Sequence, residues 1–384
     1  MSAPGPTARV DALSCGRDHT LALLASGRVL GWGGDGSGHR APPLPPGVCS
    51  APTADGAPVA VGLQRKTLAL AAGYGVSLGL DDTGRIAVWG ANKAGIGGRL
   101  DAIVPARPQA VGGLEDVDVR AVAAGEFLFG ALDGAGKVYT WGLNNDGALG
   151  RPGAQLNAAP GLVRGLPAVR QLALGRGYML ALTRGERLYA WGNNGAGQLG
   201  LGHLASLEAP ARAAPAQLRF DSVAAGATHS LGVSVHGKVY AWGSNQHGQL
   251  GEGPDALPFA LAPRAVRLPE RARAVAAGMH FSLALGVSGT VYAWGWNGHG
   301  QLGLGDTDDR HAALAVPGLA RVQAIAAGEI HAAALTPEGL FGWGSNANGQ
   351  LGAQSNTQLG TRLGAQLGNA ARLHKRPVPF FHTT

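Results

Sequence analysis

One dipeptide recurs along this 384-residue chain at nearly regular intervals, and it limits what the chain can fold into. Seven Trp-Gly pairs each end an apolar run, with tryptophans at Trp32, Trp89, Trp141, Trp191, Trp242, Trp294 and Trp343. Successive tryptophans lie 49 to 57 residues apart, and a glycine stands 15 or 16 residues before each of them. These glycines are Gly16, Gly73, Gly125, Gly175, Gly226, Gly278 and Gly328. A fixed core with joints of variable length indicates one stacked structural repeat rather than several unrelated domains.

The repeat around Trp294 shows the secondary structure most clearly. Residues 275–278, 281–285 and 289–295 are short apolar or alternating segments separated by glycine. This pattern predicts antiparallel strands joined by tight turns. No segment keeps a helical period long enough to predict a helix instead. A single four-stranded sheet cannot bury both of its faces, whereas several sheets arranged radially can. We therefore predict an all-β fold, a seven-bladed β-propeller with four-stranded antiparallel blades.

The register of the repeats also predicts how the chain is divided and closed. We expect residues 1–9 to form a short flexible N-terminus and residues 10–384 to form a single propeller, with repeats of about 51 residues. The C-terminal run 376–380 resembles the joints at 107–111 and 262–266, whereas the first repeat begins almost directly with its first strand. Pairing of the N- and C-terminal strands would remove two open sheet edges and close the ring.

Two residue types of the repeat have structural explanations. The tryptophans fit a role as packing wedges between blades, because large aromatic side chains contribute most when fully buried. An Asn follows each tryptophan by three residues in six repeats, with Asp35 in the first. These are Asn92, Asn144, Asn194, Asn245, Asn297 and Asn346. Asx side chains accept hydrogen bonds from turn backbone, so we interpret these positions as structural.

The run from Ala224 to Gly251 carries a specific resemblance. It contains Ala-Ala-Gly, His-Ser-Leu and Val-Tyr-Ala-Trp-Gly-Ser-Asn-Gln-His-Gly-Gln-Leu-Gly. This pattern resembles the repeat of the regulator of chromosome condensation family, and the resemblance extends from about Val10 to Phe381. It implies a seven-bladed propeller. The family includes an exchange factor for the small GTPase Ran, a plant ultraviolet-B photoreceptor, a secreted β-lactamase inhibitor and many adaptor modules, so it determines the fold better than the function.

The turns just after the repeat glycines differ from unit to unit. Equivalent positions of equivalent blades should emerge together on one face of the disk, around the axis. Their mixture of Arg, aromatic, Met and Ile side chains is typical of a protein-binding surface. The alternative is that they are simply exposed, variable turns. The candidate partner-binding residues are Arg17, Asp18, Tyr74, Glu126, Phe127, Arg176, Tyr178, Met279, His280, Glu329 and Ile330.

Catalytic and cofactor motifs are weak. Residues 31–36 match the dinucleotide pattern G-x-G-x-x-G, but they lie in a strand and turn with no helix after them. Asp306, Asp308 and Asp309 lack the glycine and the distal glutamate of a calcium-binding EF-hand loop. We therefore expect no enzyme activity, no catalytic residue, no metal and no cofactor.

The histidines and cysteines lead to the same expectation. His19, His229 and His331 share one repeat position, which we interpret as packing at a strand end rather than as a metal ring. Cys15 replaces an alanine before Gly16 and fits a buried small residue. Because Cys15 and Cys49 are the only cysteines, we expect no dependence on disulfides.

Charge and targeting signals limit the expected partners and the expected location of the protein. The formal charge of +7 is spread along the chain, with its densest group at residues 372–376, and residues 1–10 hold only Arg9. A dispersed charge of this size keeps a surface soluble, so we do not expect the partner to be a nucleic acid. No signal peptide or membrane-spanning run is visible. We expect a soluble, cytoplasmic protein with no membrane partner.

The function predicted from these patterns is that of a protein-protein interaction scaffold, which binds a partner of unknown identity on one face of the disk. Two alternatives stay open: guanine-nucleotide exchange on a small GTPase, and inhibition of a partner enzyme. Repeats three to seven contain no inserted wedge of the kind that exchange would need, and the first two depart from the pattern without gaining length. The photoreceptor analogy implies tryptophans in the axial turns, whereas the only tryptophan outside the framework is Trp296.

Overall fold

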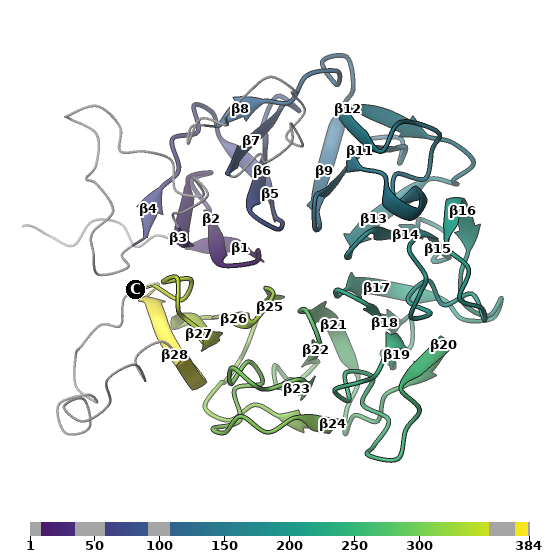
Figure 1. Cartoon of the computed structure of the whole chain (residues 1–384). Helices are drawn as coiled ribbons and strands as arrows, with labels where there is room; N and C mark the ends of the chain where they lie inside the picture. Colours follow the sequence, from purple (N-terminus) through teal and green to yellow (C-terminus); the bar gives the residue numbers. More distant parts are fainter. Residues whose placement is uncertain (1–8, 35–57, 91–107, 353–372, 383–384) are drawn as a thin grey trace, which may run out of the picture.

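The computed structural model describes residues 9–34, 58–90, 108–352 and 373–382. These residues form seven four-stranded antiparallel sheets arranged radially around one axis (Figure 1). The predicted seven-bladed β-propeller is therefore confirmed. Among the described residues the only helix is one 3₁₀ turn, η1 (Asn145–Gly147).

Each blade is built from four strands that follow one another in the sequence. Blades one to three contain β1 (Val10–Cys15), β2 (His19–Leu24), β3 (Val29–Gly33), β4 (Val59–Ala60), β5 (Thr67–Ala72), β6 (Val76–Asp81), β7 (Ile86–Gly90), β8 (Gln109–Ala110), β9 (Val119–Ala124), β10 (Leu128–Asp133), β11 (Val138–Leu143) and β12 (Leu156–Val163). Blades four and five contain β13 (Val169–Leu174), β14 (Tyr178–Thr183), β15 (Leu188–Gly192), β16 (Leu207–Arg212), β17 (Phe220–Ala225), β18 (His229–Ser234), β19 (Val239–Ser244) and β20 (Phe259–Ala265). Blades six and seven contain β21 (Ala272–Ala277), β22 (Phe281–Gly286), β23 (Val291–Gly295), β24 (Arg310–Ala315), β25 (Ala324–Ala327), β26 (His331–Thr336), β27 (Gly339–Ser345) and β28 (Leu373–His382).

The second strand of each blade is the most deeply buried. Every residue of β14, β18 and β22 is buried. A strand in this position has a hydrogen-bonded neighbour on each side within its own sheet and an adjacent blade against each face. This explains why its sequence is almost continuously apolar rather than alternating.

The framework tryptophans lie between neighbouring blades. Each of the seven is at most 1% exposed. Trp141 of blade three packs in one core cluster with Leu78 and Val88 of blade two. The indole N–H of Trp242 donates to the carbonyl of Gln198 in the preceding blade at 2.8 Å, and Trp294 does the same to Gln249 at 2.8 Å. Their interpretation as wedges between blades agrees with this placement.

The repeated asparagines stabilise the loop after the third strand. The side-chain oxygens of five of them accept hydrogen bonds at 2.9–3.0 Å from the backbone N–H of a leucine five residues later. The five are Asn144, Asn194, Asn245, Asn297 and Asn346. The structural interpretation is confirmed for these five, while Asp35 and Asn92 lie outside the described residues.

The predicted mode of ring closure is wrong. The last described strand, β28, pairs with β27 and completes blade seven, while β1 pairs with β2 in blade one. The C-terminal strand is therefore the ordinary fourth strand of its own blade and not a surplus one. The junction between the last and first blades is made instead by β1 packing against β25 and β26. The hydrogen bond from the Glu329 backbone N–H to the Gly16 carbonyl, at 3.2 Å, also spans this junction.

Candidate functional site at the mouth of the axis

The turns between the first and second strands gather at one end of the axis, which we call the upper face. At the opposite end, the lower face, lie the turns between the second and third strands. The repeat glycines bring the upper turns together, because a Cβ on Gly73 would lie 2.6 Å from the carbonyl oxygen of Gly125 in the next blade. A Cβ on Gly125 would lie 2.8 Å from the oxygen of Gly175. Only glycine permits this approach of blade to blade.

Backbone hydrogen bonds link these turns around the axis. The N–H of Arg17 donates to the Gly73 carbonyl at 3.2 Å, and the N–H of Tyr74 donates to the Gly125 carbonyl at 3.2 Å. Met279 donates to the carbonyl of Glu329 at 3.0 Å. The residue after each of these glycines is therefore held in a defined place, and its side chain is presented at the mouth of the axis.

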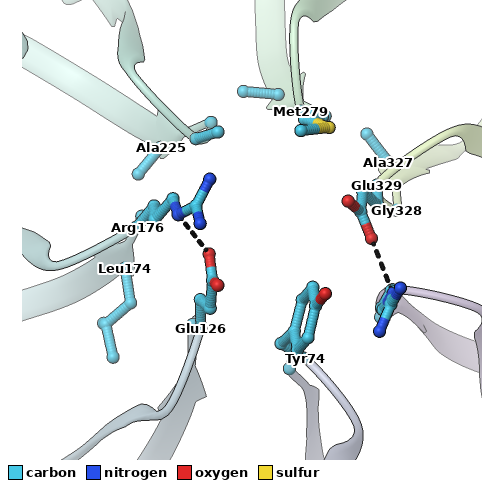
Figure 2. A pocket seen from close by; sticks show the side chains of 18 of the residues that line it. Tyr74, Glu126, Leu174, Arg176, Ala225, Met279, Ala327, Gly328 and Glu329 are labelled. Carbon is cyan, nitrogen blue, oxygen red and sulfur yellow. Dashed lines mark ion pairs between the residues drawn. The ribbon is translucent and has the colours of Figure 1, made fainter. Parts of the chain in front are cut away.

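The turns enclose a pocket of about 290 Å³ on the axis (Figure 2). Its wall consists of the seven repeat glycines and the small residues before them, with Cys15 and Leu174 replacing alanine in two blades. Cys15 is a buried free thiol, as expected, and burial raises its pKa to about 12. Because the wall is formed mostly by small residues, the larger side chains at the rim determine which groups of a partner the pocket can bind.

Two ion pairs occupy much of the rim. Arg17 Nε lies 3.1 Å from Glu329 Oε2, and Arg176 Nε lies 2.9 Å from Glu126 Oε2 (Figure 2). The Arg17 guanidinium also stacks over the Tyr74 ring, 4.3 Å from its centroid. Burial raises the pKa of Glu126 and of Glu329, and the neighbouring arginines partly offset this. The rim is thus charged but internally compensated.

The sector of the rim at blades five and six is less polar. It carries Ala227 and Met279 instead of charged residues. Just outside it lie four rings, which we call the His-Trp cluster: His247, His280, Trp296 and His299. The centroids of His247 and His280 are 5.3 Å apart, and those of Trp296 and His299 are 5.2 Å apart. The upper face therefore combines a compensated charged sector with an apolar and aromatic one.

Ten of the eleven candidate residues are at least partly exposed in the structure. The side chains of Arg17 and Arg176 are 48% and 60% exposed, and Phe127 contacts Tyr74 edge-on with ring centroids 5.3 Å apart. Tyr178 is the exception and was wrongly included. It is fully buried at the start of β14, where its hydroxyl donates to the His229 carbonyl at 2.6 Å. It belongs to the blade interface and not to the surface.

The His-Trp cluster contains residues that the sequence analysis missed. His247 and His299 lie in two different loops, after β19 and after β23, and reach the same spot only in the folded ring. Trp296 was recognised as lying outside the framework, but spacing along the chain gave no signal that three histidines surround it.

The histidines of the shared repeat position pack between blades as expected. Nε2 of His229 lies 3.0 Å from Ser282 Oγ in the next blade, and Nε2 of His331 lies 3.0 Å from Thr20 Oγ1. The equivalent distance from His19 to Ser77 is 2.9 Å. Each imidazole therefore makes a cross-blade hydrogen bond.

The buried His331 predicts a loss of stability in acid. Burial lowers the pKa of His331 to about 3, whereas an unfolded histidine titrates near about 6.5. The folded state favours the neutral ring, so stability is complete above about pH 6.5 and declines as the pH falls toward 3. We expect His331→Gln to flatten the fall in the urea midpoint between pH 6 and pH 4, whereas replacing the exposed His236 should leave it unchanged. Parallel pH profiles for wild type and His331→Gln would contradict this account.

The aspartates considered for calcium are used within their own loop. Asp306 Oδ1 accepts from the Asn297 amide at 3.0 Å, and Asp306 pairs with Arg310 at 2.5 Å. Asp309 accepts from the Asn297 backbone N–H at 2.8 Å and lies 3.0 Å from His247 Nδ1. In the described part of the chain no group of three His, Cys, Asp or Glu side chains is arranged to hold a metal. The same residues include no helix long and apolar enough to cross a bilayer.

Comparison with known protein families agrees with the blade pattern. A model of the RCC1-like domain matches residues 99–381, and a model of the regulator of chromosome condensation (RCC1) repeat matches residues 10–38. The chain belongs to the RCC1-like family. The family resemblance seen in the repeat sequence is thereby confirmed.

Individual relatives of this RCC1-like chain differ in function. It is 32% identical over 301 residues to the ultraviolet-B receptor UVR8 of Arabidopsis thaliana, which covers 76% of the chain and 68% of the receptor. It is 32% identical over 336 residues to the secretion-regulating guanine nucleotide exchange factor of Bos taurus, which covers 81% of the chain and 60% of that factor. The crystal structure of human WBSCR16 superimposes with a TM-score of 0.74 at 25% identity, covering 84% of this chain and 90% of that one. The chain spans only 15 to 26% of the length of three human HERC ligases that it also resembles.

Proposed function

We propose that this RCC1-like protein is a protein-interaction scaffold that binds a protein partner at the mouth of the axis on its upper face. The observation that carries the proposal is the composition of the rim, where exposed Arg17 and Arg176 stand beside Tyr74, Phe127 and Met279. Aromatic and arginine side chains at the centre of a surface, surrounded by polar groups, are the residues that most often dominate binding energy. The family membership supports the same reading, because its propeller presents equivalent turns on one face.

A rim variant tests this site. We expect Arg17→Gln, Arg176→Gln, Tyr74→Ala and Phe127→Ala, combined in one protein, to weaken partner binding by about a hundredfold or more, because several anchor side chains are removed together. The melting temperature should fall only modestly, since Arg17, Arg176 and Tyr74 lie at turns and the partly exposed Phe127 packs only against the outside of a core cluster. The partner is first captured with the wild-type protein from the native organism, and its affinity for each variant is then measured by titration.

The matched control changes two charges on the lower face, Arg28→Gln and Arg85→Gln, and should keep the wild-type affinity. Unchanged affinity in the rim variant would place the binding surface elsewhere.

Guanine-nucleotide exchange on a small GTPase is the second candidate, favoured by the 32% identity to the secretion-regulating exchange factor. Release of a fluorescent nucleotide from a panel of small GTPases separates the two. Acceleration by wild type that is lost in the rim variant would favour exchange, whereas partner binding without acceleration would favour simple scaffolding.

A further inference from the structure

Basic side chains are concentrated in one sector of the lower face. In each blade this face comprises the turn between the second and third strands and the segment that leads from a fourth strand into the next blade, each counted with the last residue of the strand before it and the first two residues of the strand after it. Between residues 163 and 291 it carries ten Arg or Lys and three Asp or Glu, whereas the other described parts of the face carry eight of each. The ten are Arg164, Arg170, Arg184, Arg187, Arg212, Arg219, Lys238, Arg267, Arg271 and Arg273. The excess of seven in this sector equals the formal charge of the whole chain, +7. Basic residues that are scattered along the sequence are therefore gathered in one sector of the folded ring.

The three carboxylates of this sector neutralise little of it. Asp221 pairs with Arg170 at 3.2 Å, and Glu186 lies 3.8 Å from Arg219. Glu270 accepts from Ser288 and Tyr292, at 2.6 Å and 3.0 Å, rather than from an arginine. Among the residues that the structure describes, no carboxylate lies within salt-bridge distance of Arg187, Arg212 or Lys238.

A pocket of about 440 Å³ lies within this sector, between the segment leading into blade five and the turn from β18 to β19. Arg219 and Lys238 line it together with Ser234, and Leu218 and Val235 add aliphatic surface. The backbone N–H of Val235 donates to the Arg219 carbonyl at 3.2 Å and holds the two segments together. The pocket thus places cations beside an exposed valine, whose exposure is 38%.

Two further guanidinium groups converge at its edge. Arg187 and Arg212 both donate to the carbonyl of Ala216, and the bond from Arg212 measures 3.1 Å. Burial, followed by the proximity of Arg219 and Arg212, lowers the pKa of the Arg187 side chain. Like charges held this close repel one another, and a bound anion would relieve that repulsion.

We propose that this pocket binds an acidic peptide segment of a partner protein, independently of the upper face. Carboxylates of the peptide would pair with Arg187, Arg219 and Lys238, and an apolar side chain would pack on Leu218 and Val235. The aliphatic surface favours a peptide over a nucleic acid strand, because strand binding uses free aromatic faces for stacking. Of the two rings that line the pocket, Tyr240 packs edge-on against Phe220 with centroids 6.1 Å apart, which leaves His236 as the one exposed ring.

Fluorescence anisotropy with a labelled ten-residue peptide of Glu and Asp around one central Leu tests the proposal in the full-length chain. We expect Arg187→Gln, Arg219→Gln and Lys238→Gln, combined, to weaken binding at least tenfold, since each removes a charge pair with the peptide. Val235→Ser should weaken binding of this peptide about threefold and leave an all-acidic peptide unaffected. Raising the salt from 50 to 200 mM should weaken wild-type binding several-fold.

The matched control removes three cations from the balanced part of the same face: Arg28→Gln, Arg85→Gln and Lys137→Gln. Its affinity should stay within twofold of wild type, and melting curves confirm that every variant is folded. An equal loss in the control would show that net charge alone attracts the peptide, which overturns the proposal. The proposal would also be overturned if the wild-type protein did not bind the peptide. It would be overturned as well if the wild-type protein bound a single-stranded RNA more tightly than the peptide and the triple variant lost that RNA binding.

Discussion

Trp242→Ala is expected to lower the free energy of unfolding by about 3–5 kcal/mol, the range observed when a buried aromatic side chain is truncated. Trp242 is fully buried among Leu180, Leu199 and Phe220 and bridges two blades. Its removal leaves a cavity and also the Gln198 carbonyl without its indole donor. Urea denaturation followed by far-ultraviolet circular dichroism measures the change.

Trp296→Ala is the matched control, because it removes the same side chain from a partly exposed position in the His-Trp cluster. Its effect should stay at about 1–2 kcal/mol, because it loses contacts with three histidine rings but leaves no buried cavity between blades. Similar losses for the two variants would contradict the assignment of Trp242 as an inter-blade wedge.

Gly73→Ala should destabilise the ring by about 2–3 kcal/mol, because the added methyl group must push two blades apart. The new Cβ would lie 2.6 Å from the Gly125 carbonyl, a main-chain atom that cannot rotate away, and 3.1 Å from the Ala124 Cβ. The same displacement would strain the hydrogen bond from the Tyr74 N–H to Gly125. Thermal and urea unfolding of the purified variant measure the loss.

Gly185→Ala is the control for a methyl group added without a clash. The nearest atom to its Cβ would be Thr183 Oγ1 at 3.8 Å, and its φ is not in the left-handed region. Its stability should therefore match or slightly exceed that of the wild type, since alanine restricts the unfolded chain. If Gly73→Ala were equally harmless, close approach of the blades would not explain the repeat glycine.

Residues whose role repeats in every blade could be predicted from the sequence. Trp242 and Asn245 each recur at a fixed place, so one local explanation had to fit all copies, and the structure agrees with it for the copies that it describes. Tyr178 was misassigned because it was grouped with the turn after Gly175. It actually occupies the repeat position of His229, which the sequence analysis had already interpreted as the end of a buried strand.

Features assembled from different repeats could not be predicted in this way. His247 and His280 meet across two blades, and Arg170 of blade four pairs with Asp221 of blade five. Spacing along the chain records neither contact, because each depends on how adjacent blades are packed. Ring closure was missed for a related reason: the C-terminal strand resembles every other fourth strand, and similarity alone does not say which blade it joins.

The membership of β28 in its own blade has a consequence for how such rings can change in size. Each structural blade coincides with one uninterrupted stretch of sequence, so duplication or loss of one stretch adds or removes a complete sheet. Every strand that the structure describes pairs within the blade formed by its own stretch of sequence. If one blade combined strands from both ends of the chain, both of those segments would have to be kept in every duplication or loss. In the arrangement seen here, the number of blades can change by one complete repeat at a time.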